Sequence, residues 1–238
     1  IITEFMKLPG LDYKIAKIIK NKYLVRKYLF ENKVDDIKQY FEIESIRDID
    51  EIKSKIKFPV MVKPCDGSGS KGARRVDSLA ELEVACRHAI ESSLIKFGVE
   101  CFVYKGNIHV LGIMRKHMTT PPAYAELGHS YPSQLSIEDR VEEVVVKAIE
   151  TLGMNFGAVN LDILITKDDR ICIIDVGARM GGNLIGSHII PIGTGVDYMG
   201  LLIKSAVGDP IDLQLNSIAK PVVTRVLALE PGKVKSLP

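Results

Sequence analysis

The sequence has almost no excess of charge of either sign. Its 32 lysine and arginine residues are nearly balanced by 30 aspartate and glutamate residues, so the formal net charge over 238 residues is only +2. Nucleic-acid and membrane partners usually require a strongly basic surface. The balance therefore gives no support for either partner and favours small molecules.

Cysteine is also scarce, with four residues and no C-x-x-C pair: Cys65, Cys86, Cys101 and Cys172. Because none has the spacing of a zinc site, we expect small buried thiols in a reducing compartment. The chain lacks an apolar run of about 18 residues and the charged, apolar, small-residue order of a signal peptide. These absences predict a cytoplasmic protein.

Apolar residues make up 46% of the chain, enough for a sizeable core in one domain or two joined halves. The elements expected in the first half are two short helices within residues 12–30 that meet near Asn21, a helix near 48–56, strands at 58–64 and 73–76, and a helix from Ser78 to about Ser93, where Ser78 and Glu81 have capping-box spacing.

The second half reads as strand pairs separated by helices. The expected elements are strands at 99–104 and 108–114, a long loop through Pro121, Pro122 and Pro132, a helix capped by Ser136 and ended by Gly153, strands at 157–166 and 171–176, a glycine-rich segment at 177–195 and a helix at 197–207. This order predicts an α+β fold in two lobes of antiparallel sheet and helices.

A glycine-rich loop follows the first expected strand and consists of Gly67, Ser68, Gly69, Ser70, Lys71 and Gly72. It is not a dinucleotide-binding turn, because a strand rather than a helix follows it, and not a Walker loop, because Ala73 replaces the required lysine. Its exposed backbone N–H groups could close over phosphate oxygens. An ordinary polar hairpin turn is the alternative.

Two lysines favour the phosphate interpretation. Lys63 lies on an otherwise apolar strand just before the loop, where desolvation of its charge is offset only if an anion is near. Lys22 could add a second cation, although a solvated helix face explains it equally well.

Two carboxylates interrupt apolar strands in the second half. Asp162 and Asn160 point to one face of their strand, and Asp175 lies on the adjacent strand. Paired carboxylates suit Mg²⁺ or Mn²⁺ that bridges nucleotide phosphates, and Arg179 could neutralise charge on a transferred phosphoryl group. The alternative is a salt bridge between Asp175 and Arg179, with Asp162 capping a turn.

Taken in order, these features resemble the ATP-grasp superfamily over nearly the whole chain. The segments that match best are Phe58 to Gly72 and Ile173 to Gly182. The resemblance implies an ATP-grasp fold with nucleotide between the lobes. Its divisions would be a helical lead-in (1–57), a small lobe with the glycine-rich flap (58–104) and a large lobe with the metal and substrate site (105–238).

The resemblance also implies ATP and Mg²⁺ (or Mn²⁺) as cofactors, and a reaction in which an acyl phosphate forms from a carboxylate and is attacked by an amine or other nucleophile. The residues that match the family pattern are Lys22, Lys63, Gly67, Ser68, Gly69, Ser70, Gly72 and Glu100 for ATP, Asp162 and Asp175 for the metal, and Arg179 and Lys116 for catalysis.

Within the superfamily, the segments Lys116-His117, Ala125 to His129 and Gly181 to Asn183 are most similar to amino-acid ligases and related carboxylate–amine ligases. This likeness implies that Glu126 meets a substrate amine and that His129, Gly182 and Asn183 line the substrate pocket. From the residues alone, His129 fits equally well a loop histidine satisfied by the backbone.

The sequence departs from the family pattern between Ser93 and Val99, where an adenine-binding strand and hinge are expected and Lys96 stands near the place of a ribose-binding acid. We expect that the protein contains these hinge residues and that the residue numbering runs across them, rather than that they are deleted. Gly177 stands where many members carry a metal-binding asparagine. A preceding α/β domain is implied too, so we expect a fragment.

Two other functions remain open at this level. One is a carbamoyl-phosphate synthase or biotin carboxylase-like enzyme that uses bicarbonate, or a purine-pathway amide ligase. The other is a nucleotide-binding module without catalysis, which the missing hinge and Gly177 would suit. The sequence does not name the acid or the amine, and it leaves monomer and homodimer equally open.

Overall fold

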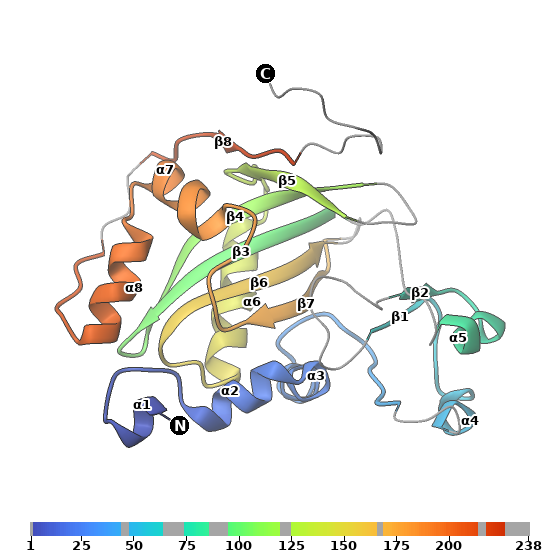
Figure 1. The fold of residues 1–238 in the computed structure, drawn as a ribbon. Helices are drawn as coiled ribbons and strands as arrows, with labels where there is room; N and C mark the ends of the chain where they lie inside the picture. Colours follow the sequence, from blue (N-terminus) through green and yellow to red (C-terminus); the bar gives the residue numbers. More distant parts are fainter. Residues whose placement is uncertain are drawn as a thin grey trace, which may run out of the picture.

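The computed structural model describes residues 2–43, 48–63, 74–85, 95–119, 125–165, 169–213 and 218–226. At its centre is a six-stranded antiparallel sheet in the order β7-β6-β3-β4-β5-β8 (Figure 1). The strands are β3 (Ile95–Tyr104), β4 (Asn107–Met118), β5 (Glu126–Tyr131), β6 (Gly157–Ile165), β7 (Ile171–Gly177) and β8 (Val222–Val223).

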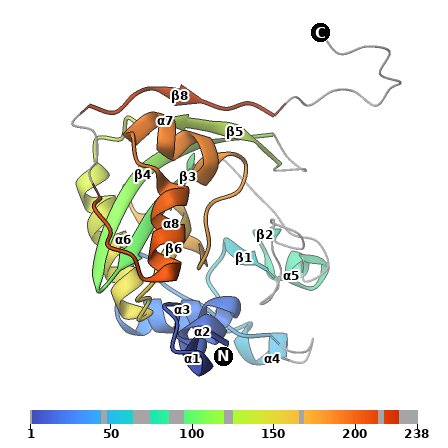
Figure 2. The ribbon, with the colours of Figure 1, turned by 60° about the vertical axis from the view of Figure 1, so that its left-hand side comes forward.

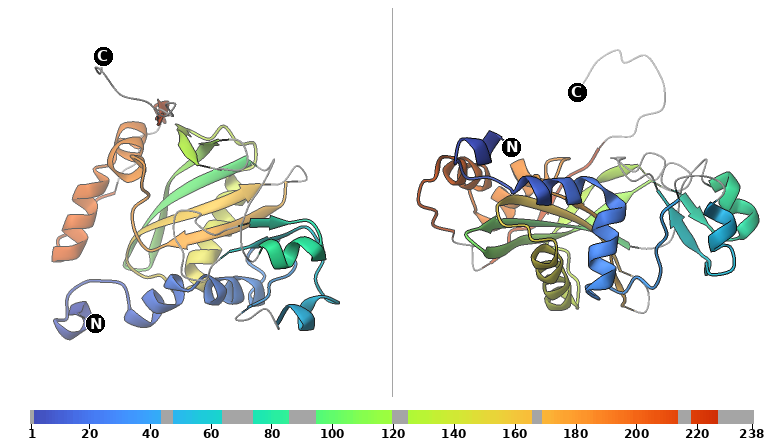
Figure 3. Two further views of the ribbon diagram at one scale, coloured as in Figure 1. Left: turned by 45° about the vertical axis from the view of Figure 1, so that its right-hand side comes forward. Right: turned by 90° about the horizontal axis from the view of Figure 1, so that it is seen from below.

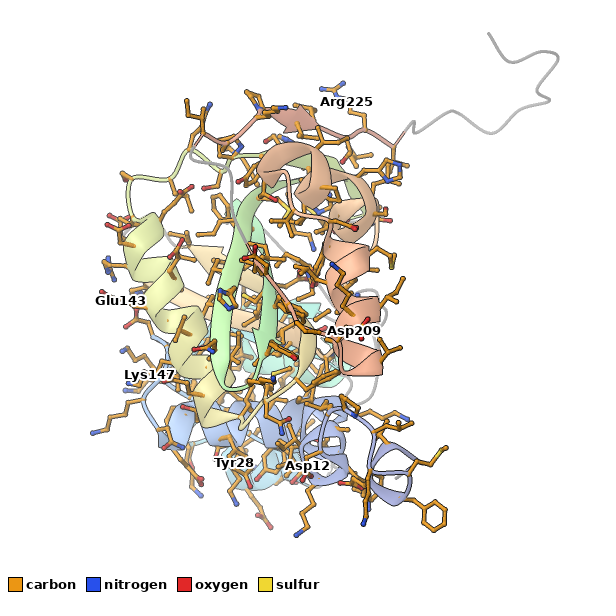
Figure 4. The ribbon with its side chains drawn as sticks, turned by 90° about the vertical axis from the view of Figure 1, so that its left-hand side faces the viewer. Asp12, Tyr28, Glu143, Lys147, Asp209 and Arg225 are labelled. Carbon is orange, nitrogen blue, oxygen red and sulfur yellow. The ribbon has the colours of Figure 1, made fainter. Side chains whose placement is uncertain are left out.

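One face of the sheet is buried under helix α6 (Glu138–Thr151) (Figure 4). Helices α2 (Tyr13–Lys20) and α3 (Lys22–Glu31) run along the β7 side, and their buried residues join the same core. Alternate residues of the central strands point into this core, because successive side chains of a strand face opposite sides of the sheet. They include Val99, Cys101, Leu161 and Ile163.

The opposite face is covered only in part. The π-helical turn η1 (Ile185–Ile189), α7 (Ile190–Thr194) and α8 (Tyr198–Val207) pack there in a second core with Phe102, Leu111 and Met114 (Figure 2). The rest of this face, toward β6 and β7, carries the polar residues of the candidate site.

A smaller unit lies beside the sheet (Figure 3). Strands β1 (Val60–Val62) and β2 (Arg74–Val76) form an antiparallel hairpin, which packs with α4 (Asp48–Ile52) and α5 (Leu79–Ala85) around Val76 and Leu82. A short helix, α1 (Ile2–Phe5), precedes α2. None of the helices within the described ranges has the length and apolar character needed to cross a membrane.

Most of the expected elements are confirmed, including the junction at Asn21, whose side chain accepts hydrogen bonds from Tyr23 N and Leu24 N. Cys101 and Cys172 are buried free thiols, as predicted, while Cys65 and Cys86 lie outside the described residues. The antiparallel sheets confirm the α+β class.

Three expectations were wrong. The loop expected through Pro121 and Pro132 contains strand β5, whose polar sequence hid its strand character. Ser136 does not cap α6, whose N-cap is Ile137 without a side-chain hydrogen bond. The strand that ends at Tyr104 was assigned to the small lobe, but β3 is hydrogen-bonded to both β4 and β6 in the large sheet.

Candidate active site

A β-bulge in β7 brings the two predicted metal ligands together. Ile171 and Ile173 face the α6 core, and simple alternation would turn Asp175 the same way. The register shifts beside Asp162, however, so that Ile163 pairs with Ile173 and Asp162 pairs directly with Asp175. The extra residue rotates Asp175 to the open face beside Asp162, a use of bulges that is common near active sites.

Each aspartate has its own lysine partner. Lys22 Nζ lies 2.5 Å from Asp175 Oδ1, and Lys116 Nζ lies 2.7 Å from Asp162 Oδ1. Lys116 reaches Asp162 across β3 beside Gly98, where an added Cβ would lie 4.0 Å from Lys116 Cδ. Burial alone would lower the pKa of Lys116, but Asp162 and Glu126 raise it above its ordinary value.

Lys63 approaches the same place from the hairpin. Its Nζ donates a hydrogen bond to the carbonyl oxygen of Ile174, the residue added by the bulge. Lys22, Lys63 and Asp175 line one small cavity. Burial lowers the pKa of Lys63 to about 8, while the nearby Asp175 opposes the shift. A bound anion would stabilise its charged form.

Glu126 is the centre of a second cluster, connected to the first by Lys116. Its Oε2 lies 2.8 Å from Lys116 Nζ, and its Oε1 accepts a hydrogen bond of 2.5 Å from Asn183 Nδ2. Burial alone would raise the pKa of Glu126, but the Lys116 charge and the Asn183 hydrogen bond hold it below the ordinary value. Glu126 is therefore ionised at neutral pH and can meet a cation.

His129 lies beside Glu126 and belongs to the same cluster. Its side chain is fully buried, 3.3 Å from Glu126 Oε1, and neither ring nitrogen has a hydrogen-bond partner among the described residues. Burial lowers its pKa, so the imidazole is neutral at physiological pH. The alternative of a loop histidine satisfied by backbone is wrong, because His129 lies on β5 and its ring is unpaired.

Glu100, which was expected to contact ATP, is buried within the protein. The side chain is wholly enclosed, and its carboxylate accepts hydrogen bonds from Gly181 N, Asn160 Nδ2 and Tyr198 Oη. Burial raises its pKa to about 7, although these three donors act in the opposite direction. Glu100 therefore anchors the glycine segment after β7.

The anchored segment has a strained backbone. Asn183 and Leu184 both have left-handed conformations, with φ of 48° and 68°, which are uncommon for residues with side chains. An added Cβ on Gly181 would lie 2.8 Å from Glu100 Oε2, whereas one on Gly182 would meet nothing within 4 Å. Gly181 is thus fixed by packing, whereas a side chain at Gly182 would meet open space.

Arg179 lies on the same segment but is exposed. Its Nη1 donates a 2.8 Å hydrogen bond to Met180 O, and Asp175 pairs with Lys22 instead. The salt-bridge alternative for Asp175 and Arg179 is therefore wrong, as is a turn-capping role for Asp162, which lies within β6. The remaining predicted residues, Gly67, Ser68, Gly69, Ser70 and Gly72, lie outside the described residues, as does the side chain of Lys96.

Sequence reasoning missed an ion pair that supports β7, the strand that carries Asp175. Arg26 Nη1 lies 2.9 Å from both oxygens of Asp35, and Asp35 Oδ2 in turn accepts a hydrogen bond from Ile173 N. The side chain of Asp35 is fully buried. A basic and an acidic residue nine positions apart give no local pattern, so only the fold reveals the pair.

The donor set suits a divalent cation. The side chains of Asp162 and Asp175 are 38% and 42% exposed, so their oxygens are accessible. No group of three or more His, Cys, Asp or Glu side chains within the described ranges is arranged to hold a metal. Mg²⁺ commonly uses one or two carboxylates and completes its shell with phosphate oxygens and water. The pair fits that arrangement.

Comparison with known proteins agrees with this geometry. The ATP-grasp domain family matches residues 19–183. Over 226 residues the chain is 26% identical to the uncharacterized protein y4rH of Sinorhizobium fredii, covering 89% of this chain and 47% of that protein. It is 29% identical over 185 residues to a D-alanine–D-alanine ligase of Rhodococcus jostii, covering 66% of this chain and 50% of that enzyme.

Solved structures show the same fold. The L-amino acid ligase of Bacillus licheniformis matches with a TM-score of 0.73 and 29% identity, covering 86% of this chain and 52% of that enzyme. The biotin carboxylase domain of Hydrogenobacter thermophilus 2-oxoglutarate carboxylase, solved with MgADP, ADP and bicarbonate, matches with a TM-score of 0.75, 19% identity and 92% and 52% coverage. The chain thus spans about half the length of these proteins.

Proposed function

Because this chain belongs to the ATP-grasp family, we propose that it is the core of an ATP-dependent ligase that phosphorylates a carboxylate and joins it to an amine. The observation that carries the proposal is the array on the open face of the sheet, where Asp175 and Asp162 lie side by side and Lys116 connects Asp162 to Glu126. A phosphate-binding end and an amine-binding end would thereby share one lysine.

At the phosphate end, Asp162 and Asp175 would hold Mg²⁺ or Mn²⁺. A bound divalent ion supplies charge neutralisation at the phosphoryl oxygens. Lys22 and Lys63 lie beside Asp175 and would hold ATP phosphates, as cations near a transferring phosphoryl group do. In the structure Lys22 is paired with Asp175.

The proposed reaction has two steps. An oxygen of the substrate carboxylate attacks the γ-phosphorus of ATP, and the bond to ADP breaks, giving an acyl phosphate. An amine bound as ammonium first loses one proton to water. Its nitrogen then attacks the acyl carbon, phosphate leaves, and the second proton released from the nitrogen passes to that phosphate. Arg179 is proposed to stabilise the acyl phosphate, and Lys116 to hold the carboxylate between the two ends.

The Glu126 cluster favours an amino acid as substrate. Glu126 is ionised, half-buried and oriented by Asn183 and Lys116, so it offers a fixed negative charge to an ammonium group. His129 adds a neutral, unpaired imidazole beside it. Gly182, which is next to Asn183 in the chain, has open space around its Cα hydrogens. The named ligases that resemble this chain act on amino acids.

The proposal is tested by measuring ADP release from ATP and Mg²⁺ with single amino acids and with pairs, and by searching for dipeptides by mass spectrometry. We expect ADP release that requires both Mg²⁺ and an amino acid. Release stimulated by bicarbonate alone would contradict the amino-acid assignment, and ATP binding without turnover across the amino acids would contradict ligase activity.

Replacing Glu126 with glutamine should impair the amine site specifically. Loss of one charge-assisted hydrogen bond costs about 1.5–3 kcal/mol, so we expect the KM for the amine substrate to rise roughly 10- to 100-fold, with the KM for ATP nearly unchanged. Steady-state kinetics of both substrates measure the change. Glu150→Gln, an exposed substitution on α6, is the matched control. An equal rise in both KM values would contradict the assignment.

A further inference from the structure

A C-terminal strap, residues 220–226, crosses the outer edge of the large sheet (Figure 2). It lies beyond residues 19–183, which the family match covers. Lys220 N donates to Gly193 O on α7, and Val226 N donates to Leu127 O on β5. Between these points β8 pairs with Ser130 and Tyr131. The strap is therefore held at both ends, with β5 as its main partner.

Thr224 makes two hydrogen bonds to the main chain of His129. Its backbone N–H donates a 2.9 Å hydrogen bond to His129 O, and its Oγ1 accepts a 3.1 Å hydrogen bond from His129 N. The imidazole itself has no hydrogen-bond partner among the described residues. Its position beside Glu126 is consequently set by packing and by the main chain that Thr224 holds.

Gly128 lets the strap approach this closely. Its φ is +138°, and an added Cβ would lie 2.0 Å from the backbone oxygen of Thr224. No L side chain would fit there without moving the strap away. Gly128 and His129 of β5 thus both depend on the strap. The absence of a side chain at Gly128 allows the strap to lie against β5, and the strap in turn fixes the main chain of His129.

We propose that Thr224 is a positioning residue for the substrate end of the site, acting through the main chain of His129. The expected change in KM rests on the proposed function, whereas the contact between Thr224 and His129 rests on the structure alone. A displaced strap would leave the Asp162 and Asp175 pair in place, because β6 and β7 lie toward the opposite edge of the sheet from β8 and β5. The effect should therefore be confined to the amino-acid substrate.

The test compares two substitutions of Thr224 in the full chain. Thr224→Val keeps the shape but removes the acceptor, whereas Thr224→Ser keeps the hydroxyl. We expect the KM for the amino-acid substrate to rise about tenfold in Thr224→Val and less than twofold in Thr224→Ser, with the KM for ATP unchanged in both. Arg225→Gln is the matched control, because Arg225 extends outward from the strap (Figure 4).

A second measurement does not depend on activity. NMR amide exchange should show faster exchange of the His129 N–H in Thr224→Val than in the wild type and Thr224→Ser, together with a changed imidazole pKa. Unchanged exchange and pKa would overturn the inference, and so would altered exchange with unchanged kinetics. If the wild type released no ADP with any amino acid, the proposed function would fail, and the exchange and pKa data would still decide the role of Thr224.

Discussion

Asp175→Asn is expected to lower kcat for ATP-dependent ligation by about a thousandfold or more, because removing an electrostatic stabiliser of a transferring phosphoryl group costs several kcal/mol of barrier. The substitution removes one member of the carboxylate pair and the partner of Lys22 while keeping the side-chain shape. Steady-state ADP release at saturating ATP, with Mg²⁺ titrated, measures both the rate and the metal requirement.

The fold should survive this change. The ion pair of Asp175 with Lys22 is partly exposed, and such pairs contribute little to stability. Asp169→Asn is the matched control, since Asp169 is an exposed aspartate between β6 and β7 with a left-handed backbone that asparagine also tolerates. A folded Asp175→Asn protein with wild-type kcat would remove Asp175 from the metal site.

The second large effect concerns Glu100 and the dependence of stability on pH. Burial raises its pKa from an ordinary 4.5 to about 7. Between these values the folded protein binds more protons than the unfolded chain, so the free energy of unfolding falls as pH rises. The shift corresponds to about 3 kcal/mol of stability that is present below pH 4.5 and lost by the time the pH passes 7.

Glu100→Gln should therefore flatten the pH dependence. Urea unfolding of the wild type and the variant between pH 4.5 and 8 gives the difference in slope, which isolates this carboxyl from other titrating groups. Glu143→Gln, on the outer face of α6, is the matched control (Figure 4). Parallel pH profiles for wild type and Glu100→Gln would show that Glu100 is not a buried acid with a raised pKa.

Apolar patterning in the sequence was sufficient to predict most of the fold. The strands around Asp162 and Asp175 and the helix at 197–207 have strong periodicity, and the structure agrees with them. Strand β5 was missed because Leu127 is its only aliphatic residue, and its pairing with β4 and β8 is long-range. Hydrogen bonding across the sheet, rather than local propensity, makes this segment a strand.

The sequence was sufficient to predict residues of the candidate site, but not how they are arranged in space. Two aspartates on neighbouring strands suggested a metal pair, but their meeting on one face depends on a bulge at Ile174 that alternation does not reveal. The family pattern suggested Glu100 as an ATP ligand, whereas Tyr198 and Gly181 enclose it. Burial is a property of the assembled fold, so position in a motif could not separate an anchoring role from a binding role.

Activation of a carboxylate by phosphorylation can be tested with an isotope-labelled substrate. The amino acid identified in the ADP-release screen would be supplied with ¹⁸O in its carboxylate, and the products analysed by mass spectrometry. We expect one ¹⁸O atom per turnover to appear in inorganic phosphate, because the carboxylate oxygen that attacks ATP leaves with that phosphate. Label in AMP, or product formed with no label in phosphate, would contradict it.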